Sequence, residues 1–225
     1  MYNFFVIATP IGNYKDITIR AIEILKELDF IVCEEEREYK RLFGYLNIPP
    51  KKFILCNEHN EDEAISLTIE LLKKGEKGGL ISDCGTPLFE DPGYKLISSI
   101  RANNFKITGL PGPNSLILAL SLSPFKIKDF YFVGFLPRKL EERESKLLNI
   151  LKRKEAIILM EAPYRLPNIL ESLKKYLKER RVFIPYNLTM EDEKLFYGSI
   201  SQVEKQIIES NVKKGEFLII IEGKL

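Results

Sequence analysis

The chain has 225 residues, 45% of them hydrophobic, which suits one large globular domain or two small ones. Basic and acidic side chains nearly balance at a net charge of +2, so the total charge neither demands nor excludes a polyanionic partner. The three cysteines (Cys33, Cys56 and Cys84) form no close pair in the sequence and indicate neither a disulfide framework nor a zinc site, which favours a reducing cytoplasm. The apolar run at residues 4–8 is too short to span a bilayer, so we expect no membrane association.

The first half of the chain alternates short β-branched runs with longer segments of helical periodicity. This alternation predicts a mostly parallel sheet with helices on both faces. Strands are expected at residues 4–8, 30–33, 52–55, 79–82 and 106–108, and helices at 18–28, 36–46, 61–74 and 94–103.

The second half shows the same kind of pattern after glycine and proline breaks at 109–113 and 121–124. We therefore predict two α/β domains, residues 1–113 and 114–225, with a ligand cleft between them. Strands are expected at 130–134, 156–160, 182–185, 194–199 and 216–222, and helices at 140–154, 166–178 and 201–209.

The most informative segment is residues 81–93, which combines glycine, proline, hydroxyl and carboxyl residues directly after a predicted strand. Glycine lets the backbone approach a ligand closely, and proline fixes the turns at either end. The pattern therefore predicts a loop whose main-chain groups form the rim of a cofactor site.

The segment 8–13 follows the first predicted strand, at the edge where open α/β sheets bind ligands. The alternative is a plain strand-to-helix turn in which Asp16 caps the next helix. No G-x-G-x-x-G or P-loop motif occurs, so the sequence gives no main signal for a dinucleotide oxidoreductase or a P-loop enzyme.

An acidic run begins at Glu34, directly after the second predicted strand. Its carboxylates either stabilise a helix start, or Glu34 orients or deprotonates a hydroxyl with Arg37 beside it. His59 is the only histidine, so no metal site is expected. The turn 110–115 leads into a helix, where its amides and the Ser115 hydroxyl can meet a polar ligand.

Basic clusters occur at residues 37–41, 138–139, 152–154 and 174–181, several of them near tyrosine or phenylalanine. Cations beside aromatic rings suit RNA, but the surface helices of any soluble protein look similar. The sequence leaves both interpretations open.

Taken in order, a set of short motifs resembles the small-subunit ribosomal RNA (cytidine-2′-O)-methyltransferases, which belong to the tetrapyrrole methylase superfamily of class III methyltransferases. The resemblance covers nearly the whole chain. Its motifs are Ala-Thr-Pro-Ile-Gly-Asn at 8–13, Glu-His-Asn-Glu at 58–61, Ser-Asp at 82–83, Gly-Thr-Pro at 85–87, Asp-Pro-Gly at 91–93, Leu-Pro-Gly-Pro at 110–113, Gly-Phe-Leu-Pro at 134–137 and Glu-Ala-Pro-Tyr-Arg-Leu at 161–166.

The resemblance implies a cytoplasmic homodimer that binds S-adenosylmethionine between its two α/β domains and methylates the ribose 2′-oxygen of a cytidine in 16S ribosomal RNA. By motif match, Glu34 is the expected proton acceptor or hydroxyl orienter, and Arg37 a phosphate or ribose clamp. The expected cofactor-binding residues are Pro10, Ser82, Asp83, Cys84, Gly85, Thr86, Pro87, Asn114, Ser115, Met160 and Glu161.

Two alternatives stay open at this point. A methyltransferase of the same fold could act on a tetrapyrrole or a protein. A non-catalytic relative that binds cofactor or RNA is suggested by Glu35 and Glu36, which stand where the resembled family usually has Asp and Thr.

Overall fold

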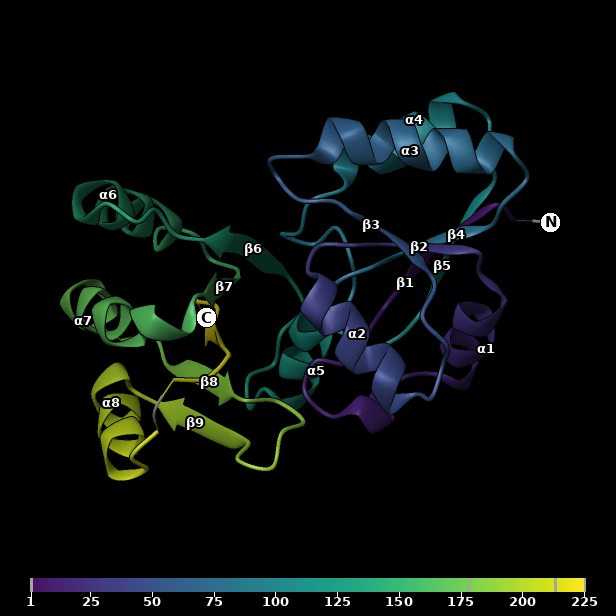
Figure 1. Ribbon diagram of the computed structural model, residues 1–225. Coiled ribbons are helices and arrows are strands. Elements are labelled where there is room, and N and C mark those ends of the chain that lie inside the picture. Colours follow the sequence, from purple (N-terminus) through teal and green to yellow (C-terminus); the bar gives the residue numbers. More distant parts are fainter. Residues whose placement is uncertain (1, 178, 213, 225) are drawn as a thin grey trace. The chain divides into compact units, whose positions relative to one another are not determined.

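The computed structural model describes residues 2–177, 179–212 and 214–224 (Figure 1). The chain divides into two compact units, Met1–Asn114 and Ser115–Leu225, each with its own five-stranded sheet. The predicted α/β class is therefore confirmed. Within the described residues, no helix combines the length and apolar character needed to cross a membrane.

The sheet of the first unit is entirely parallel, as its alternating pattern predicts. Its strand order is β3-β2-β4-β1-β5. The strands are β1 (Phe4–Ile7), β2 (Phe30–Cys33), β3 (Lys52–Leu55), β4 (Gly78–Ile81) and β5 (Ile107–Leu110).

Helices cover both faces of this sheet (Figure 1). Helices α1 (Ile19–Glu27) and α2 (Glu36–Tyr45) pack on one face, where Leu25 and Tyr39 join the core. Helices α3 (Glu61–Lys73) and α4 (Tyr94–Ala102) pack on the other. Two apolar layers therefore bury the strands on both sides, as parallel sheets require.

The strand order creates a topological switch point between β1 and β4, which are neighbours in the sheet. The chain leaves β1 through α1 toward β2, beyond β4, and leaves β4 through α4 toward β5, beyond β1. Ligands of open α/β sheets bind at the carboxyl ends of such strands. The segments 8–13 and 82–93 both begin at this point.

Gly78 allows β4 to lie tightly against its neighbours. A Cβ atom at this position would come within 2.2 Å of the Phe30 ring. Gly78→Ala should therefore lower the free energy of unfolding by about 1–3 kcal/mol, the usual cost of overpacking a core. Urea denaturation would measure it, with Gly109→Ala in β5 as the matched control because a Cβ there meets nothing within 4 Å. Equal losses in the two variants would contradict the packing argument.

The second unit has a mixed sheet of order β6-β7-β10-β8-β9. Only β6 and β7 pair in parallel, and the other described pairs are antiparallel. Its elements are α5 (Ser115–Leu122), β6 (Phe130–Phe135), α6 (Leu140–Ile150), β7 (Ala156–Glu161), α7 (Leu166–Tyr176), β8 (Val182–Tyr186), β9 (Lys194–Gly198), α8 (Ile200–Glu209) and β10 (Phe217–Ile221). Apolar side chains of α6, α7 and α8 form one core with the sheet.

Some expectations need correction. Asp16 does not cap α1; it ends a short 3-10 turn, and the Thr18 hydroxyl accepts the capping bond from the Ala21 amide at 3.1 Å. The helix expected at 140–154 stops at Ile150 because the next residues form a turn whose carbonyls at Arg153 and Glu155 accept hydrogen bonds from Arg180. The helix expected at 166–178 ends at Tyr176, and Lys178 lies outside the described residues.

Candidate active site

Two buried hydroxyls join the loops that follow β1 and β4. The Thr9 hydroxyl donates to the Ser82 carbonyl at 3.0 Å, and the Ser82 hydroxyl donates to the Gly85 carbonyl at 2.7 Å. The Thr9 amide donates to the same Gly85 carbonyl at 2.8 Å. The loop after β4 is therefore fastened to the end of β1 by partners 73 to 76 residues apart in the sequence.

Glycine is required where the loop 110–114 meets the loops that follow β1 and β4. Gly85 has a φ of +86°, in the left-handed region that favours glycine. A Cβ at Gly112 would lie 2.9 Å from the Cβ of Ala8, so the loop 110–114 packs against the end of β1. The Thr86 hydroxyl adds a hydrogen bond to the Pro113 carbonyl at 3.1 Å. The three loops thus meet with little side-chain bulk between them.

The loop after β4 also holds backbone strain. Leu88 and Glu90 have φ values of +73° and +74°, which are unfavourable for residues other than glycine. Each such residue costs about 1–3 kcal/mol, and such residues concentrate at functional sites. This observation favours a functional role for the loop over that of a simple connection.

Three carboxyl groups interact at the same edge of the sheet: Glu34 after β2, Asp83 after β4, and Asp91 further along the loop. Burial, and then the charge of Glu34, raise the pKa of Asp83 to about 6. Burial, and then the charge of Asp83, raise the pKa of Asp91 to about 6. The pKa of Glu34 is raised by burial and next by Asp91. The Glu35 amide donates to Asp83 at 3.2 Å, which ties the start of α2 to the cluster.

This cluster has two chemical consequences. Neighbouring carboxylates attract a cationic ligand, and a carboxylate with a raised pKa is a better proton acceptor near neutral pH. The described residues contain no group of histidine, cysteine, aspartate and glutamate side chains that could hold a metal ion. The charges and raised pKa values of the three carboxyl groups suit a cationic ligand and proton transfer.

The raised pKa of Asp91 predicts a pH-dependent stability. Between pH 3.8 and about 6 the folded protein retains a proton that the unfolded chain has lost, so the free energy of unfolding falls as pH rises through this window. Asp91→Asn should make this fall shallower and raise the melting temperature above pH 6. Melting curves from pH 4 to 8 would measure it, with Asp62→Asn, at a side chain 91% exposed, as the charge-matched control. An unchanged pH profile for Asp91→Asn would contradict the interpretation.

The structure places the other predicted residues of the first unit as follows. Pro10 and Pro87 are buried at the loop junction, and Cys84 is exposed, with its thiol donating to the Ile11 carbonyl at 3.5 Å. Asn114 ends the first unit, and Ser115 begins α5 in the second. Arg37 is exposed on α2 and forms no ion pair with the described residues.

Met160 and Glu161 end β7 in the second unit, where the Glu161 side chain is fully buried. Its Oε1 accepts from the Leu136 amide at 3.1 Å, and its Oε2 pairs with Arg165 Nε at 2.7 Å. Burial raises the pKa of Glu161, whereas the Leu136 amide and Arg165 oppose that rise. The carboxylate is thus used within its own unit, and its predicted contact with a cofactor stays a prediction.

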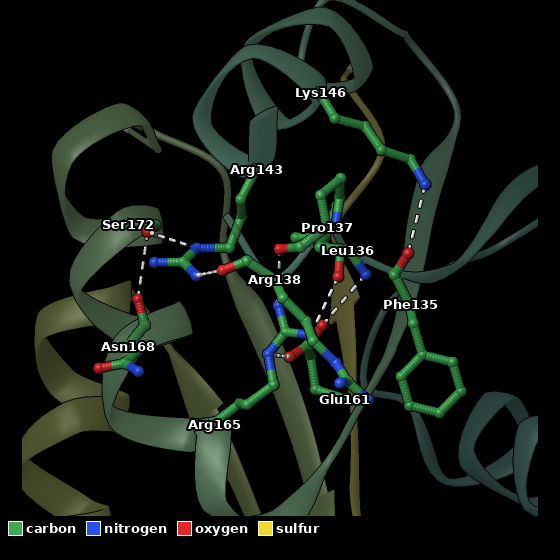
Figure 2. Close-up of polar contacts among 10 residues, drawn as sticks. All are labelled: Phe135, Leu136, Pro137, Arg138, Arg143, Lys146, Glu161, Arg165, Asn168 and Ser172. Atoms are coloured by element: carbon green, nitrogen blue, oxygen red, sulfur yellow. Dashed lines mark hydrogen bonds and ion pairs between the residues drawn. The ribbon is translucent and has the colours of Figure 1, made fainter. Parts of the chain in front are cut away.

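Cationic side chains that local sequence patterns do not reveal hold the loop 135–138. Four consecutive carbonyls of this loop accept from cationic side chains (Figure 2). Lys146 binds Phe135, Arg165 binds Leu136 and Pro137, and Arg143 binds Arg138 at distances of 2.9–3.4 Å. In the sequence, the only indication of these contacts was the four-residue spacing of Glu161 and Arg165, together with the Gly-Phe-Leu-Pro motif at 134–137.

The family model described as "Tetrapyrrole (Corrin/Porphyrin) Methylases" matches residues 3–204. The chain belongs to the tetrapyrrole methylase family. The resemblance seen in the motifs is therefore confirmed.

Individual members of the tetrapyrrole methylase family match over nearly the full chain. A Vibrio cholerae protein named "Ribosomal RNA small subunit methyltransferase I" is 37% identical over 97% of this chain and 76% of its own length. A Thermotoga maritima protein of the same name is 34% identical over 100% of both chains. A solved uroporphyrin-III C-methyltransferase from Thermus thermophilus, complexed with S-adenyl homocysteine, shares the fold with a TM-score of 0.64 at 14% identity, covering 97% of this chain and 96% of its own.

Proposed function

We propose that this protein is an S-adenosylmethionine-dependent methyltransferase that modifies the 2′-hydroxyl of a cytidine in 16S ribosomal RNA. The observation that carries the proposal is the match to relatives named as small-subunit ribosomal RNA methyltransferases, which in Thermotoga maritima spans both chains completely. The switch-point site of the first unit supplies the chemistry that such a reaction needs. The solved precorrin and uroporphyrin methyltransferases share the fold at 13–18% identity, whereas the relatives named for ribosomal RNA are 33–37% identical.

The residues of the first unit fit the cofactor. S-adenosylmethionine supplies a methyl group that is already activated by its positively charged sulfur. The neighbouring carboxylates of Asp83 and Asp91 complement such a charge. The close packing at Gly85 and Gly112 leaves main-chain groups at the rim for polar contacts. The proposed binding residues are Pro10, Ser82, Asp83, Cys84, Gly85, Thr86, Pro87, Asn114 and Ser115 from these loops, with Met160 and Glu161 from the second unit.

Glu34 is the proposed proton acceptor. It follows β2, adjacent to β4 in the sheet, and its raised pKa strengthens it as a base. Its carboxylate would orient the ribose hydroxyl and accept its proton. Arg37, exposed one turn later on α2, would bind a phosphate or ribose oxygen of the RNA.

The proposal includes a cytoplasmic location and a homodimer. Cys33 and Cys56 are buried thiols that form no disulfide among the described residues, which is compatible with a reducing compartment. Sedimentation of the purified protein would test the dimer.

Methyl transfer from labelled S-adenosylmethionine to purified small ribosomal subunits tests the activity. Subunits from cells lacking the protein should accept one methyl group, and mapping of ribose methylation should show one site lost in those cells. Incorporation only into a tetrapyrrole or a protein would support a rival substrate. Cofactor binding without methylation of any of these substrates would support the non-catalytic alternative.

A further inference from the structure

Cationic side chains gather at the end of the second unit where β6 and β7 begin. They line a hollow of about 290 Å³ formed by three segments distant in sequence, at residues 126–129, 154–156 and 223–224. We use the name basic surface for the cations in and beside this hollow: Lys126, Lys128, Lys152, Arg153, Lys154, Arg180 and Lys224.

The backbone beneath the basic surface is tightly built. Arg180 donates to three carbonyls, those of Glu222, Arg153 and Glu155, the last at 2.7 Å. The Lys224 amide donates to the Lys154 carbonyl at 2.7 Å. A Cβ at Gly223 would lie 3.2 Å from that carbonyl, so the chain end packs directly on the turn. The Lys224 ammonium also donates to the Lys152 carbonyl at 3.3 Å, so the backbone that carries these lysines is held by several hydrogen bonds.

The positive charge of the basic surface is largely uncompensated. Beside its seven cations lie three carboxylates, Asp129 and Glu155 in the hollow and Glu222, whose charge acts on Arg180, whereas the whole chain carries a net charge of only +2. Glu155 pairs with Arg153 at 3.6 Å, which is the only ion pair of the basic surface among the described residues. Among the residues that the structure describes, none of the four lysines of the hollow forms an ion pair. Such a concentration of charge favours a polyanionic partner.

Exposed aromatic rings adjoin this charge. The Arg153 guanidinium lies over the Tyr131 ring at 3.8 Å from its centroid, and Tyr131 remains 36% exposed. Phe130, the first residue of β6, is 41% exposed. Aromatic faces beside arginine stack on unpaired bases, which a membrane surface or an acidic protein does not offer.

We propose that the basic surface docks the phosphate backbone of single-stranded or looped RNA, with Tyr131 and Phe130 as stacking faces for its bases. This inference rests on the proposed function and adds which surface of the protein binds the RNA substrate. Lysines on flexible stems bind phosphates without reading sequence, so the surface contributes affinity while base identity is read elsewhere.

The test is a variant carrying Lys126→Gln, Lys128→Gln, Lys154→Gln and Lys224→Gln. Its KM for small ribosomal subunits should rise at least about tenfold with kcat unchanged, because four phosphate contacts are lost. The slope of log KM against log salt should become shallower by about 3. The control replaces Lys26, Lys52, Lys73 and Lys106, four exposed lysines of the first unit, with glutamine and should leave both quantities unchanged.

Filter binding of unmodified 16S ribosomal RNA gives a second readout that does not depend on methylation. Equal RNA affinity of the wild-type protein and the basic-surface variant would overturn the inference. Wild-type protein that binds this RNA but methylates no small subunit would instead overturn the proposed function. The variant could instead lose binding to phosphatidylserine vesicles while its RNA affinity stays intact. That result would assign the surface to an anionic membrane and overturn the RNA proposal.

Discussion

Replacing Glu34 with glutamine should lower the methylation turnover by about 10²–10⁴-fold, the usual contribution of a positioned general base. Glutamine keeps the shape of the side chain but cannot accept the hydroxyl proton. Because Glu34 is not among the proposed cofactor contacts, the dissociation constant of S-adenosylmethionine should stay the same. Single-turnover methylation of small subunits and calorimetric titration of the cofactor measure the two quantities.

Glu35→Gln is the matched control for this prediction. Glu35 is adjacent and exposed, and its hydrogen bond to Asp83 comes from its backbone amide, which the substitution retains. Turnover in this variant should remain near that of the wild type. Undiminished turnover in Glu34→Gln would remove Glu34 from the mechanism.

The pH dependence of turnover gives a further check on Glu34. If its carboxylate must be ionised, activity declines as pH falls through its raised pKa, so the acidic limb lies above the ordinary value of 4.5. Asp91 is the largest charged contributor to that rise. Asp91→Asn should therefore shift the acidic limb to lower pH, whereas a base outside the cluster would leave it in place.

Replacing Arg165 with methionine should destabilise the second unit by about 3–5 kcal/mol, because it leaves the fully buried Glu161 carboxylate without its ion pair. The same change removes the donors to the Leu136 and Pro137 carbonyls. Urea denaturation followed by circular dichroism would measure the loss.

Two further variants separate charge from packing in this contact. Adding Glu161→Gln to Arg165→Met removes the uncompensated charge and should recover part of the lost stability. Arg138→Met, at an exposed side chain in the same loop, should change the stability little. A similar loss in Arg138→Met and Arg165→Met would contradict the assignment of the cost to the buried pair.

Local periodicity was sufficient to predict most elements of the fold. The strands at 30–33 and 52–55 have the predicted bounds, and α3 and α4 differ from prediction by one residue at the C-terminus. The helix predicted at 140–154 was too long. Arg180, 27 residues after Arg153, donates hydrogen bonds to carbonyls of the turn that follows α6. A partner that distant leaves no trace in the periodicity of the segment.

The candidate site likewise has features that the sequence could predict and features that depend on the fold. The glycines and hydroxyls of 82–87 predicted a close-packed loop from residue chemistry alone. The sequence could not show that Thr9 and Ser82 meet, since this depends on β4 lying beside β1. It also could not show that the Glu161 carboxylate is held by Arg165 and the Leu136 amide.

Residue patterns were therefore sufficient to predict the α/β class, the position of most helices and strands, the family and the loops that follow the key strands. These properties depend on residues close together in the chain. Three features came to light in the folded chain alone: the switch point between β1 and β4, the mutual influence of Glu34, Asp83 and Asp91 on their pKa values, and the assembly of the basic surface. Each of these arises from groups separated by tens of residues, and their energies depend on the distances and burial that the fold creates.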